Sequence, residues 1–375
     1  MKENSLIKVL FTIPNFDTAG SGKALLNIAT RLNSNYFEPH ICCFHNKGDF
    51  FQTVENSNIP IHIFQFTSDM KYRLKGLLKC FIIAKYFKKL NVDLIHSFHY
   101  APDYTEVLSA KLAGIPWVYT KKNMNWGGKS KNGWKLRSLL AKHIIAQNNS
   151  MLNWYFPNSS KVTLIPRGVD IKIFKPQSKN IKLLEQLTIL ESEIIILSVA
   201  NLVPVKGIEI LLDAFELLYK THDNIRLLIV GEDKNEYGES LKGKTRKLLS
   251  GGKIHFIGKV QNIEDYYSIA DIFILPTLNE GRMEGCPVSL LEAMACGVHV
   301  MASKLPGIKD ILTPFNNCLF NPGEIPELYN GIENLLNEKK YLRINKNLRT
   351  HIINNYSIEK EVNSHEALYK KCMNL

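Results

Sequence analysis

The sequence predicts an α/β protein built from two Rossmann-like domains with parallel sheets, facing each other across an interdomain cleft. Short apolar segments with the character of strands alternate with helical stretches in both halves of the chain. Such alternation is typical of parallel sheets that are covered by helices on both faces. At 375 residues the chain is also long for one hydrophobic core, so two domains of ordinary size are expected.

The strands are expected where short apolar runs end in turn residues. They are residues 7–13, 40–44, 61–66, 94–98, 117–120 and 144–146 in the first half, and 194–199, 226–230, 255–257, 272–275 and 299–302 in the second. Between them, helical patterns are expected at 22–32, 73–90, 103–113, 208–219, 263–270 and 287–295.

Composition limits the class of protein. With 45% apolar and 22% charged residues the chain reads as a soluble globular protein. Its longest apolar stretches, such as 193–200, are too short to span a bilayer, and no small-residue cleavage site follows the N-terminus, so a cytoplasmic protein is expected. The seven cysteines include no Cys-x-x-Cys and no cluster with His at metal-ligand spacing. Neither a metal nor a cofactor is therefore predicted.

The excess positive charge lies entirely in the first half. Residues 1–170 hold 22 Lys plus Arg against 10 Asp plus Glu, whereas residues 171–375 hold 25 of each kind. This asymmetry predicts an anionic partner for the first half: nucleic acid, a membrane surface or a phosphorylated substrate. Residues 71–90 are basic and amphipathic, so their apolar face either packs on the sheet or contacts a membrane interface. The loop 121–142 mixes Trp126 and Trp134 with basic residues, which suits anionic headgroups.

The most informative motif is a pair of carboxylates, Glu284 and Glu292, with seven residues between them around a predicted helix start. Pro287 suits the first helical position, and Gly297 suits the position just past the helix end. The helix is apolar nearly all round, so it should be buried and carry Glu292 into the interior. A buried charge needs partners.

Two interpretations of this pair remain open. In the structural one, Glu292 pairs with a nearby Lys or Arg and Glu284 is a loop residue. In the other, ligand hydroxyls bind the carboxylates while the amides at Gly285 and Cys286, near a helix N-terminus, bind a phosphate. A glycosidase also uses two carboxylates, roughly 5 to 9.5 Å apart. Eight positions along a helix span about 12 Å, which weakens that alternative.

The wider segment 270–310 resembles the nucleotide-sugar site of retaining glycosyltransferases of family 4, which have the GT-B fold. The resemblance extends over roughly residues 6–372 and is strongest in the second half. It implies that Glu284 reaches the hydroxyls of the donor sugar and that Glu292 holds the ribose. Together with Gly285, Cys286 and Pro287, these residues would bind the donor.

The loop 200–207 follows the first strand of the second domain. In the family a basic pair in this loop holds the diphosphate of the donor. Lys206 matches the second member of the pair and is assigned a catalytic role beside Glu284. Asn201 stands where Arg is usual, and an amide can hydrogen-bond but carries no charge.

Residues 19–24 follow the first strand and lead into a helix. They are not a P-loop, because Asp17 stands where the leading Gly is required and Ala24 where Ser or Thr binds Mg²⁺. They resemble the first glycine-rich loop of the family, whose backbone borders the reacting sugar and phosphates. Gly20 is therefore assigned to donor binding.

Three further residues are assigned to the acceptor or phosphate side: His99, Lys122 and Asn123. His99 follows a strand end, where open α/β sheets place ligands. Residues 120–126 stand where many relatives carry a His, and Lys122 can contact phosphate or acceptor from this position.

The resemblance also indicates the domain boundaries. Residues 161–170 are similar to the segment at which the first domain of the family ends, so the N-terminal domain is expected at 1–170 and the nucleotide-sugar domain at 171–356. Residues 177–191 would be an exposed connection. The last helix, about 357–372, resembles the terminal helix of the family, which crosses back onto the first domain.

These observations predict a retaining, metal-independent glycosyltransferase of the hexosyltransferase type. Its donor would be a UDP-, GDP- or ADP-linked sugar, and its acceptor a lipid-linked or free saccharide in bacterial cell-surface polysaccharide or glycolipid synthesis. An anionic membrane surface is an expected partner, with the protein peripheral on the inner face of the membrane. Two alternatives remain: a basic nucleic-acid-binding protein, although no RNA or DNA module is recognised and no nucleic acid is expected, and a sugar-nucleotide epimerase of the same fold.

Overall fold

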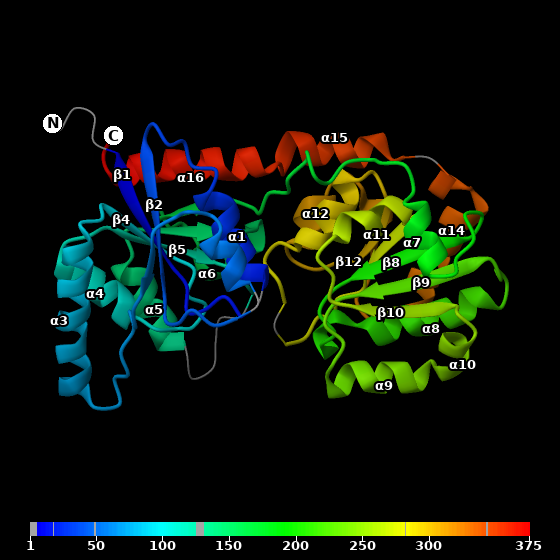
Figure 1. The fold of residues 1–375 in the computed structure, drawn as a ribbon, viewed down its shortest axis with the longest axis horizontal. Coiled ribbons are helices and arrows are strands. Elements are labelled where there is room, and N and C mark those ends of the chain that lie inside the picture. The colour runs from blue at the N-terminus through cyan, green and yellow to red at the C-terminus, as the bar shows by residue number, and fades with distance from the viewer. Residues whose placement is uncertain (1–5, 18, 49, 125–130, 282, 343) are drawn as a thin grey trace. The chain divides into compact units, whose positions relative to one another are not determined.

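The computed structural model describes residues 6–375 except 18, 49, 125–130, 282 and 343 (Figure 1). The chain divides into two compact units. Unit 1 comprises Met1–Arg167 together with Ile358–Leu375, and unit 2 comprises Gly168–Ser357. The sequence-based boundary lies at 170, three residues beyond the end of the first segment of unit 1.

Unit 1 contains a seven-stranded parallel sheet in the order β3-β2-β1-β4-β5-β6-β7. Its strands are β1 (Ile7–Thr12), β2 (Phe37–Cys43), β3 (Ile61–Ile63), β4 (Leu94–Ser97), β5 (Trp117–Lys121), β6 (His143–Ala146) and β7 (Val162–Leu164). Its helices are α1 (Ala19–Ala29), α2 (Phe51–Glu55), α3 (Arg73–Leu90), α4 (Thr105–Ala113), α5 (Lys131–Leu140), α6 (Asn149–Tyr155) and α16 (Ile358–Cys372). The strand order reverses between β1 and β4, and parallel α/β sheets bind ligands at the carboxyl ends of the strands at such a point.

Unit 2 contains a six-stranded parallel sheet in the order β10-β9-β8-β11-β12-β13. Its strands are β8 (Ile194–Val199), β9 (Ile225–Val230), β10 (Ile254–Gly258), β11 (Ile272–Leu275), β12 (His299–Ser303) and β13 (Leu319–Phe320). Its α-helices are α7 (Ile181–Gln186), α8 (Ile208–Tyr219), α9 (Glu236–Lys244), α10 (Arg246–Ser250), α11 (Ile263–Ile269), α12 (Val288–Ala295), α13 (Ile308–Leu312), α14 (Ile325–Asn337) and α15 (Lys346–Asn355). Short 3-10 helices lie at η2 (Pro204–Lys206), η3 (Asn316–Cys318) and η4 (Lys340–Leu342). The strand order reverses between β8 and β11, so the carboxyl ends of these two strands are where this sheet is expected to bind a ligand.

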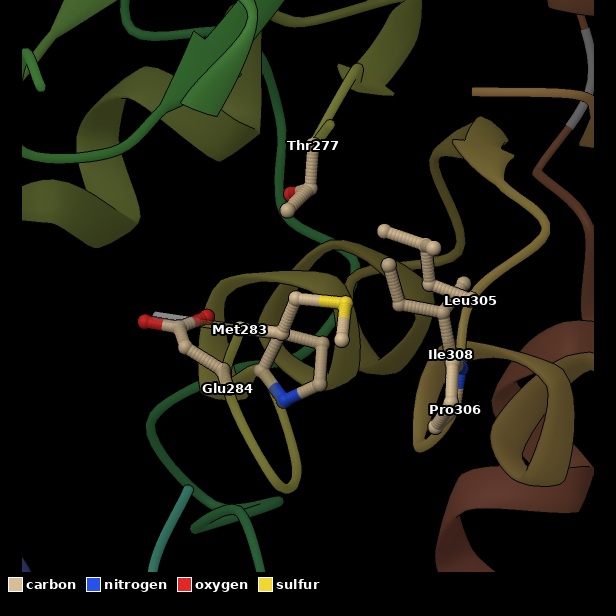
Figure 2. A pocket seen from close by; sticks show the side chains of 7 residues that line it. Thr277, Met283, Glu284, Leu305, Pro306 and Ile308 are labelled. Atoms are coloured by element: carbon tan, nitrogen blue, oxygen red, sulfur yellow. The ribbon is translucent and has the colours of Figure 1, made fainter. Parts of the chain in front are cut away.

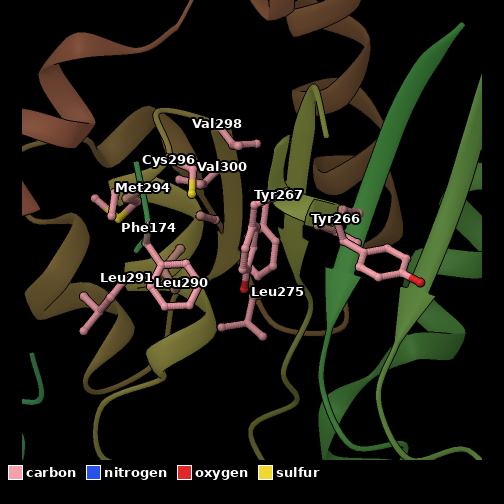
Figure 3. Close-up of a cluster of buried hydrophobic side chains, with 14 of the residues drawn as sticks. Phe174, Tyr266, Tyr267, Leu275, Leu290, Leu291, Met294, Cys296, Val298 and Val300 are labelled. Atoms are coloured by element: carbon pink, nitrogen blue, oxygen red, sulfur yellow. The ribbon is translucent and has the colours of Figure 1, made fainter. Parts of the chain in front are cut away.

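Burial on both faces explains why the central strands are continuous apolar runs. In β8, Ile195 and Leu197 pack into a core beneath α11 and α12, while Ile194 and Ile196 face the opposite core beneath α8 and α14. Successive side chains of a strand point to opposite faces, so both sets must be apolar when helices cover both sides. Figure 3 shows part of the first core, where Leu275 of β11 lies among side chains of α11 and α12.

The predicted exposed connection at 177–191 is wrong. It contains α7, whose N-cap Asn180 accepts a hydrogen bond from the amide of Leu183 at 3.2 Å. Leu183, Leu184 and Ile189 are buried in the core of unit 2. Asn is a strong N-cap residue, and the apolar side chains that follow it hold the short helix against α11.

Two strands were not predicted from the sequence. β7 has three residues and β13 has two, and each continues one edge of its sheet. Apart from the buried Phe320, their side chains are partly buried or, at Leu164, exposed. Such short, half-buried runs carry too little hydrophobic pattern to stand out from a loop.

Helix α3 has the predicted bounds but buries a different face. Its small and apolar residues on one side are buried against the unit, whereas the stripe that contains Leu74, Leu78 and Ile82 is exposed. The interpretation in which this stripe packs on the sheet is therefore wrong. None of the helices built from described residues is long and apolar enough to cross a membrane.

The last helix, α16, packs onto unit 1, as the sequence resemblance implied. Ile358, Val362 and Tyr369 join the core formed by α1 and the β1 face of the sheet. Two polar contacts fix it: Arg167 pairs with Glu361 at 3.1 Å, and the hydroxyl of Tyr369 lies 2.6 Å from Nδ1 of the buried His96.

Candidate active site

In unit 2 the segments that leave β8 and β11 meet at the reversal of strand order. The chain after β8 forms η2 and then turns at Gly207, whose φ is +62°. A Cβ at this position would lie 2.2 Å from the carbonyl oxygen of Pro276, which follows β11. Glycine is therefore required both for the conformation and for the close approach. The amide of Leu278 donates to the carbonyl of Val205 at 2.8 Å, which joins the two segments.

This junction brings together two of the predicted site residues. Nζ of Lys206 lies 2.8 Å from Oε1 of Glu284. The side chain of Lys206 is 11% exposed, whereas that of Glu284 is 49% exposed. The lysine is thus held in a nearly dry place while its partner stays largely hydrated. A single cation in such a place interacts strongly with any anion that replaces its partner.

A small pocket adjoins Glu284. It is lined by residues of the segments that follow β11 and β12, namely Thr277, Met283, Glu284, Pro287, Leu305, Pro306 and Ile308. In Figure 2 the carboxylate of Glu284 points away from the apolar side chains of Met283, Leu305 and Ile308. The carboxylate of Glu284 therefore lies beside the apolar side chains of the pocket and is directed away from them.

Helix α12 starts one residue later than predicted. Pro287 is its N-cap, with φ −74° and ψ 114°, and Val288 is its first helical residue. Gly285, Cys286 and Pro287 are all buried and lead the chain into the N-terminus of α12. Gly297 follows the helix with φ +75°, a conformation that favours glycine. The N-terminus of α12, which is the positive end of its dipole, therefore follows four residues after Glu284, the ion-pair partner of Lys206.

Glu292 is buried within α12, as the apolar surface of the helix predicted, and is 8% exposed. The hydroxyl of Tyr267 on α11 lies 3.0 Å from its Oε2 and 3.1 Å from the carbonyl oxygen of Ser289. Burial, reinforced by the nearby Glu292 carboxylate, raises the pKa of Tyr267 well above its ordinary value. Tyr267 therefore stays protonated and acts as a hydrogen-bond donor. Sequence reasoning missed Tyr267, because nothing in the motif around Glu292 points to a residue 25 positions earlier.

Asn201 is exposed directly after β8, five residues before Lys206. Gly231, which follows β9, has φ +147°, and a Cβ there would lie 1.9 Å from the carbonyl oxygen of Ala200. The backbones that leave β8 and β9 are thus in close contact. Asn201 and Lys206 lie on one short loop at the same edge of the sheet.

In unit 1, Lys122 follows β5 and reaches the start of α1. Its Nζ donates to Oγ of Ser21 at 3.1 Å and to the carbonyl oxygen of Phe98. It also lies over the rings of Phe98 and Tyr100, at 5.5 and 5.4 Å from their centroids. Lys122 therefore connects the segments that follow β4 and β5 to the first turn of α1.

Gly20 lies in that first turn, so the expected glycine-rich loop is instead helical at this residue. Gly20 is exposed, and a Cβ there would meet no atom within 4 Å. Gly22 is the glycine needed for packing, because a Cβ there would lie 2.7 Å from the ring of Phe16. The helix begins earlier than the sequence predicted since neither glycine adopts a positive φ.

His99 and Asn123 are more constrained than their sequence positions suggest. His99 is 8% exposed, and burial, with Arg137 and Lys122 nearby, lowers its pKa to about 3. It is therefore neutral at physiological pH. Oδ1 of Asn123 accepts a hydrogen bond at 2.9 Å from Lys121, which is itself 1% exposed.

Two buried charged residues that sequence reasoning missed, Arg137 and Glu106, support this edge of unit 1 and are linked through the hydroxyl of Ser97. Arg137 on α5 is completely buried and donates to the carbonyl oxygens of Ala101, Asp103 and His99 at 2.9 to 3.1 Å. Glu106 on α4 is also completely buried, and burial raises its pKa while Arg137 opposes the rise. Through these hydrogen bonds Arg137 fixes the loop that carries His99.

Within the residues that the structure describes, no group of three or more His, Cys, Asp or Glu side chains lies close enough to hold a metal ion.

Comparison with known families agrees with this arrangement. Residues 180–355 match the family model described as "Glycosyl transferases group 1". Residues 18–173 match the model described as "Glycosyltransferase Family 4". The two matches cover the greater part of unit 2 and unit 1 respectively.

Individual proteins show the same relationship. The chain is 25% identical to the N,N'-diacetylbacillosaminyl-diphospho-undecaprenol alpha-1,3-N-acetylgalactosaminyltransferase of Campylobacter jejuni, over 80% of this chain and 82% of that protein. It is 24% identical to the capsular polysaccharide biosynthesis glycosyltransferase CapH of Staphylococcus aureus, over 91% of this chain and 94% of that protein. Among solved structures, HepE of Anabaena in complex with UDP and glucose superimposes with a TM-score of 0.81 at 20% identity, covering 97% of this chain and 99% of that one.

Two Rossmann-like units, the two family matches and the structural likeness together identify this chain as a GT-B glycosyltransferase of the family 4 type.

Proposed function

We propose that this protein transfers a sugar from a nucleotide diphosphate donor to an acceptor with retention of the anomeric configuration and without a metal. The observation that carries the proposal is the pairing of Lys206 with Glu284 at the strand-order reversal of unit 2, 2.8 Å apart. A cation and a carboxylate are thus adjacent at the edge of the sheet where phosphorylated ligands bind. Their two chemical roles are different and complementary.

Lys206 would bind the diphosphate. In transfer, the bond between the sugar carbon and the diphosphate oxygen breaks, and negative charge builds on that oxygen. A nearly buried ammonium group stabilises this charge because little water screens it. The N-terminus of α12, reached through Gly285, Cys286 and Pro287, would add its dipole. With Lys206 in this role, the reaction does not depend on a divalent metal.

Glu284 would bind hydroxyl groups of the donor sugar. In the structure its carboxylate is paired with Lys206. When a diphosphate replaces Glu284 as the ion-pair partner of Lys206, the carboxylate becomes available to accept hydrogen bonds from the sugar. Donor binding would therefore exchange one ion pair for another, which limits the electrostatic cost of releasing Glu284.

Glu292 would hold the ribose. Its carboxylate is buried and fixed by Tyr267, so it can accept hydrogen bonds from the two ribose hydroxyls with little loss of side-chain entropy. Asn201 would contribute a neutral hydrogen bond at the phosphates, since it carries no charge.

Unit 1 would supply the acceptor side. Lys122 and Asn123 follow β5. Gly20, which would border the donor, lies next to Ser21, the hydrogen-bond partner of Lys122. His99 is neutral at this edge, so its role would be a hydrogen bond or an apolar contact and not a charge.

The relatives suggest the substrates to try first. The Campylobacter jejuni enzyme is named for a diphospho-undecaprenol acceptor, and the Anabaena structure contains UDP. We therefore propose a UDP-linked sugar as donor, with GDP- and ADP-linked sugars as alternatives, and a lipid-linked saccharide as acceptor. The role would be in cell-surface polysaccharide or glycolipid synthesis, at the anionic inner face of the membrane.

A donor screen tests the proposal. Purified protein is incubated with UDP-, GDP- and ADP-linked hexoses, with and without EDTA, and release of the nucleoside diphosphate is measured. Acceptor-dependent release from one donor class, unchanged by EDTA, is expected, and the product should retain the anomeric configuration of the donor. Formation of an epimeric sugar without acceptor would identify an epimerase instead. Loss of activity in EDTA that Mg²⁺ or Mn²⁺ restores would contradict the metal-free mechanism.

A further inference from the structure

Helix α3 of unit 1 exposes a stripe of large apolar side chains that nothing in the active site uses. Five side chains on one side of the helix are between 40% and 80% exposed. They are Leu74 (80%), Leu77 (40%), Leu78 (63%), Phe81 (47%) and Ile82 (60%). Their spacing of three and four residues places them on one face. Soluble proteins seldom expose a continuous apolar patch of this kind without a partner.

The opposite face of α3 explains why this stripe is left outside. The buried residues are Gly76, Cys80, Ile83, Ala84 and Phe87. Gly76 sits so close to the preceding loop that a Cβ there would lie 2.8 Å from the carbonyl oxygen of Asp69. Small residues let the helix backbone approach the unit closely, so rotating the helix to bury the leucines would require the packing to be rebuilt. The exposed stripe is therefore a fixed feature of the fold.

Basic residues surround and continue the stripe. Lys75 and Lys79 flank it, and α3 contains no acidic residue. Lys85 lies four residues after Phe81, and Lys88 and Lys89 follow seven residues after Phe81 and Ile82, so these three lysines occupy the same face in the last two turns. All five lysines are exposed. The outward face of α3 is thus apolar at its N-terminal end and cationic at its C-terminal end. In Figure 1, α3 lies at the surface of unit 1, beside α4.

From this arrangement we propose that the outward face of α3 docks unit 1 on an anionic lipid bilayer. The apolar stripe would enter the boundary between headgroups and acyl chains, and the lysines would reach lipid phosphates with their flexible stems. The inference deepens the proposed function, because it names the surface that would bring the enzyme to a lipid-linked acceptor.

The charge pattern favours a bilayer over a second copy of the chain. A symmetric contact through this face would bring the same patch of each copy together. Lysines from both copies would then face each other with no acidic residue on either helix to pair with them. The cores of protein interfaces are also depleted in lysine. An anionic surface offers both an apolar layer and the opposite charge.

Vesicle cosedimentation tests the proposal. Full-length protein is mixed with vesicles of phosphatidylcholine alone or of phosphatidylcholine with phosphatidylglycerol, at low and high salt. We expect binding to the mixed vesicles at low salt, and weaker binding as salt screens the lysines. Replacing Leu74, Leu78 and Ile82 together with Gln, a good helix former, should reduce partitioning by about tenfold or more.

Two further variants separate the contributions. Replacing the lysines with Gln should weaken binding and remove most of its salt dependence; the set is Lys75, Lys79, Lys85 and Lys88. A matched control replaces three exposed leucines of unit 2 with Gln and should bind like the wild type; these are Leu190, Leu217 and Leu342, at 67%, 42% and 67% exposure. Circular dichroism melts check that each variant is folded.

The possible outcomes distinguish the inference from the proposed function. Equal binding of the leucine variant and the wild type, or no preference for anionic vesicles, would overturn the inference. So would a concentration-dependent dimer in ultracentrifugation that disappears in the leucine variant, which would assign the face to self-association. A Glu284→Gln protein should bind vesicles like the wild type, because α3 lies in the other unit. If vesicle binding holds while no donor is turned over, the proposed function fails and the docking surface stands.

Discussion

Replacing Lys206 with Met removes the charge at the proposed diphosphate site while keeping most of the side-chain volume. Lys206 is nearly buried and its ion-pair partner, Glu284, is half exposed. After the substitution the carboxylate of Glu284 therefore remains hydrated, and no unpaired charge is trapped inside unit 2. Because water screens the half-exposed Glu284 end of the ion pair, and Met fills the space of the lysine stem, the free energy of unfolding should fall by no more than about 1 kcal/mol. The variant should consequently fold.

The effect on the ligand should be much larger than the effect on folding. A hydrogen bond to a charged group contributes about 1.5 to 3 kcal/mol, which corresponds to roughly a 10- to 150-fold loss of affinity for the nucleoside diphosphate. The nucleoside alone lacks phosphate, so its affinity should stay within about threefold. Since charge grows on the leaving oxygen in the transition state, turnover should fall further, by about 100-fold or more.

Isothermal titration with UDP and with uridine, followed by turnover at saturating donor, measures these effects. If another base proves correct in the donor screen, its nucleoside and diphosphate are used instead. The control is Lys179→Met, because Lys179 also pairs with a carboxylate, that of Asp271 at 3.2 Å. The carboxylate of Asp271 accepts a hydrogen bond from the amide of Ile195 near the start of β8. This pair therefore lies at the amino ends of the strands, away from Lys206 at their carboxyl ends. An equal loss for diphosphate and nucleoside in the Lys206 variant, or no loss for either, would show that Lys206 does not bind the phosphates.

Three other outcomes are expected. Glu284→Gln should reduce turnover by about 100-fold while UDP affinity changes little, because this carboxylate is assigned to the sugar; unchanged turnover would remove it from the site. Glu292→Ala should weaken binding of UDP and uridine alike by about tenfold. Tyr267→Phe should weaken both by roughly threefold to tenfold, because the hydrogen bond that orients the Glu292 carboxylate is lost; calorimetry showing wild-type affinity in both variants would contradict the ribose assignment. Thermal stability should fall as pH decreases from about 6.5 towards 4, because His99 has a folded pKa near 3 and His365 near 4, both below the ordinary 6.5. Above pH 6.5 both histidines are neutral in the folded and the unfolded protein, so they do not favour unfolding. Below pH 6.5 the unfolded chain binds protons that the folded protein does not, which favours unfolding. A melting temperature that does not change over this range would contradict this reasoning.

The parts of the fold that the sequence predicted well are those whose local pattern agrees with their burial. β8 and β11 were predicted with the observed bounds because helices cover both of their faces, which leaves an uninterrupted apolar run. Helix α12 is similar, since nearly every residue around its circumference is buried. The burial of Glu292 followed directly from that pattern.

The parts that the sequence could not predict depend on contacts between distant residues. Arg137 lies in the segment 121–142, for which the sequence predicts a basic loop, yet it is completely buried and is linked through Ser97 to Glu106, 31 positions earlier in the chain. Helix α3 shows the same limit in another form. Its pattern contains one face of large apolar residues and one of smaller residues, and hydrophobicity alone favours burying the larger. The glycine and alanine on the smaller face, Gly76 and Ala84, were the available signal, since small residues at helical spacing permit close packing.

The division of charge between the two units gives a physical reason for both proposals. Unit 2, residues 168–357, holds 22 Lys plus Arg against 23 Asp plus Glu, so this unit does not attract anions as a whole. In the proposed function a doubly charged diphosphate would instead be bound at one place, by the nearly buried Lys206 and the N-terminus of α12, where low exposure makes a single charge effective. Residues 1–170 carry a net +12, and the lysines of α3 are exposed, so each contributes weakly but over a distance set by salt. A small soluble ligand requires the first arrangement, because it must be held in one orientation. An extended anionic surface requires the second, because many weak contacts bind it reversibly and still permit the enzyme to move along it.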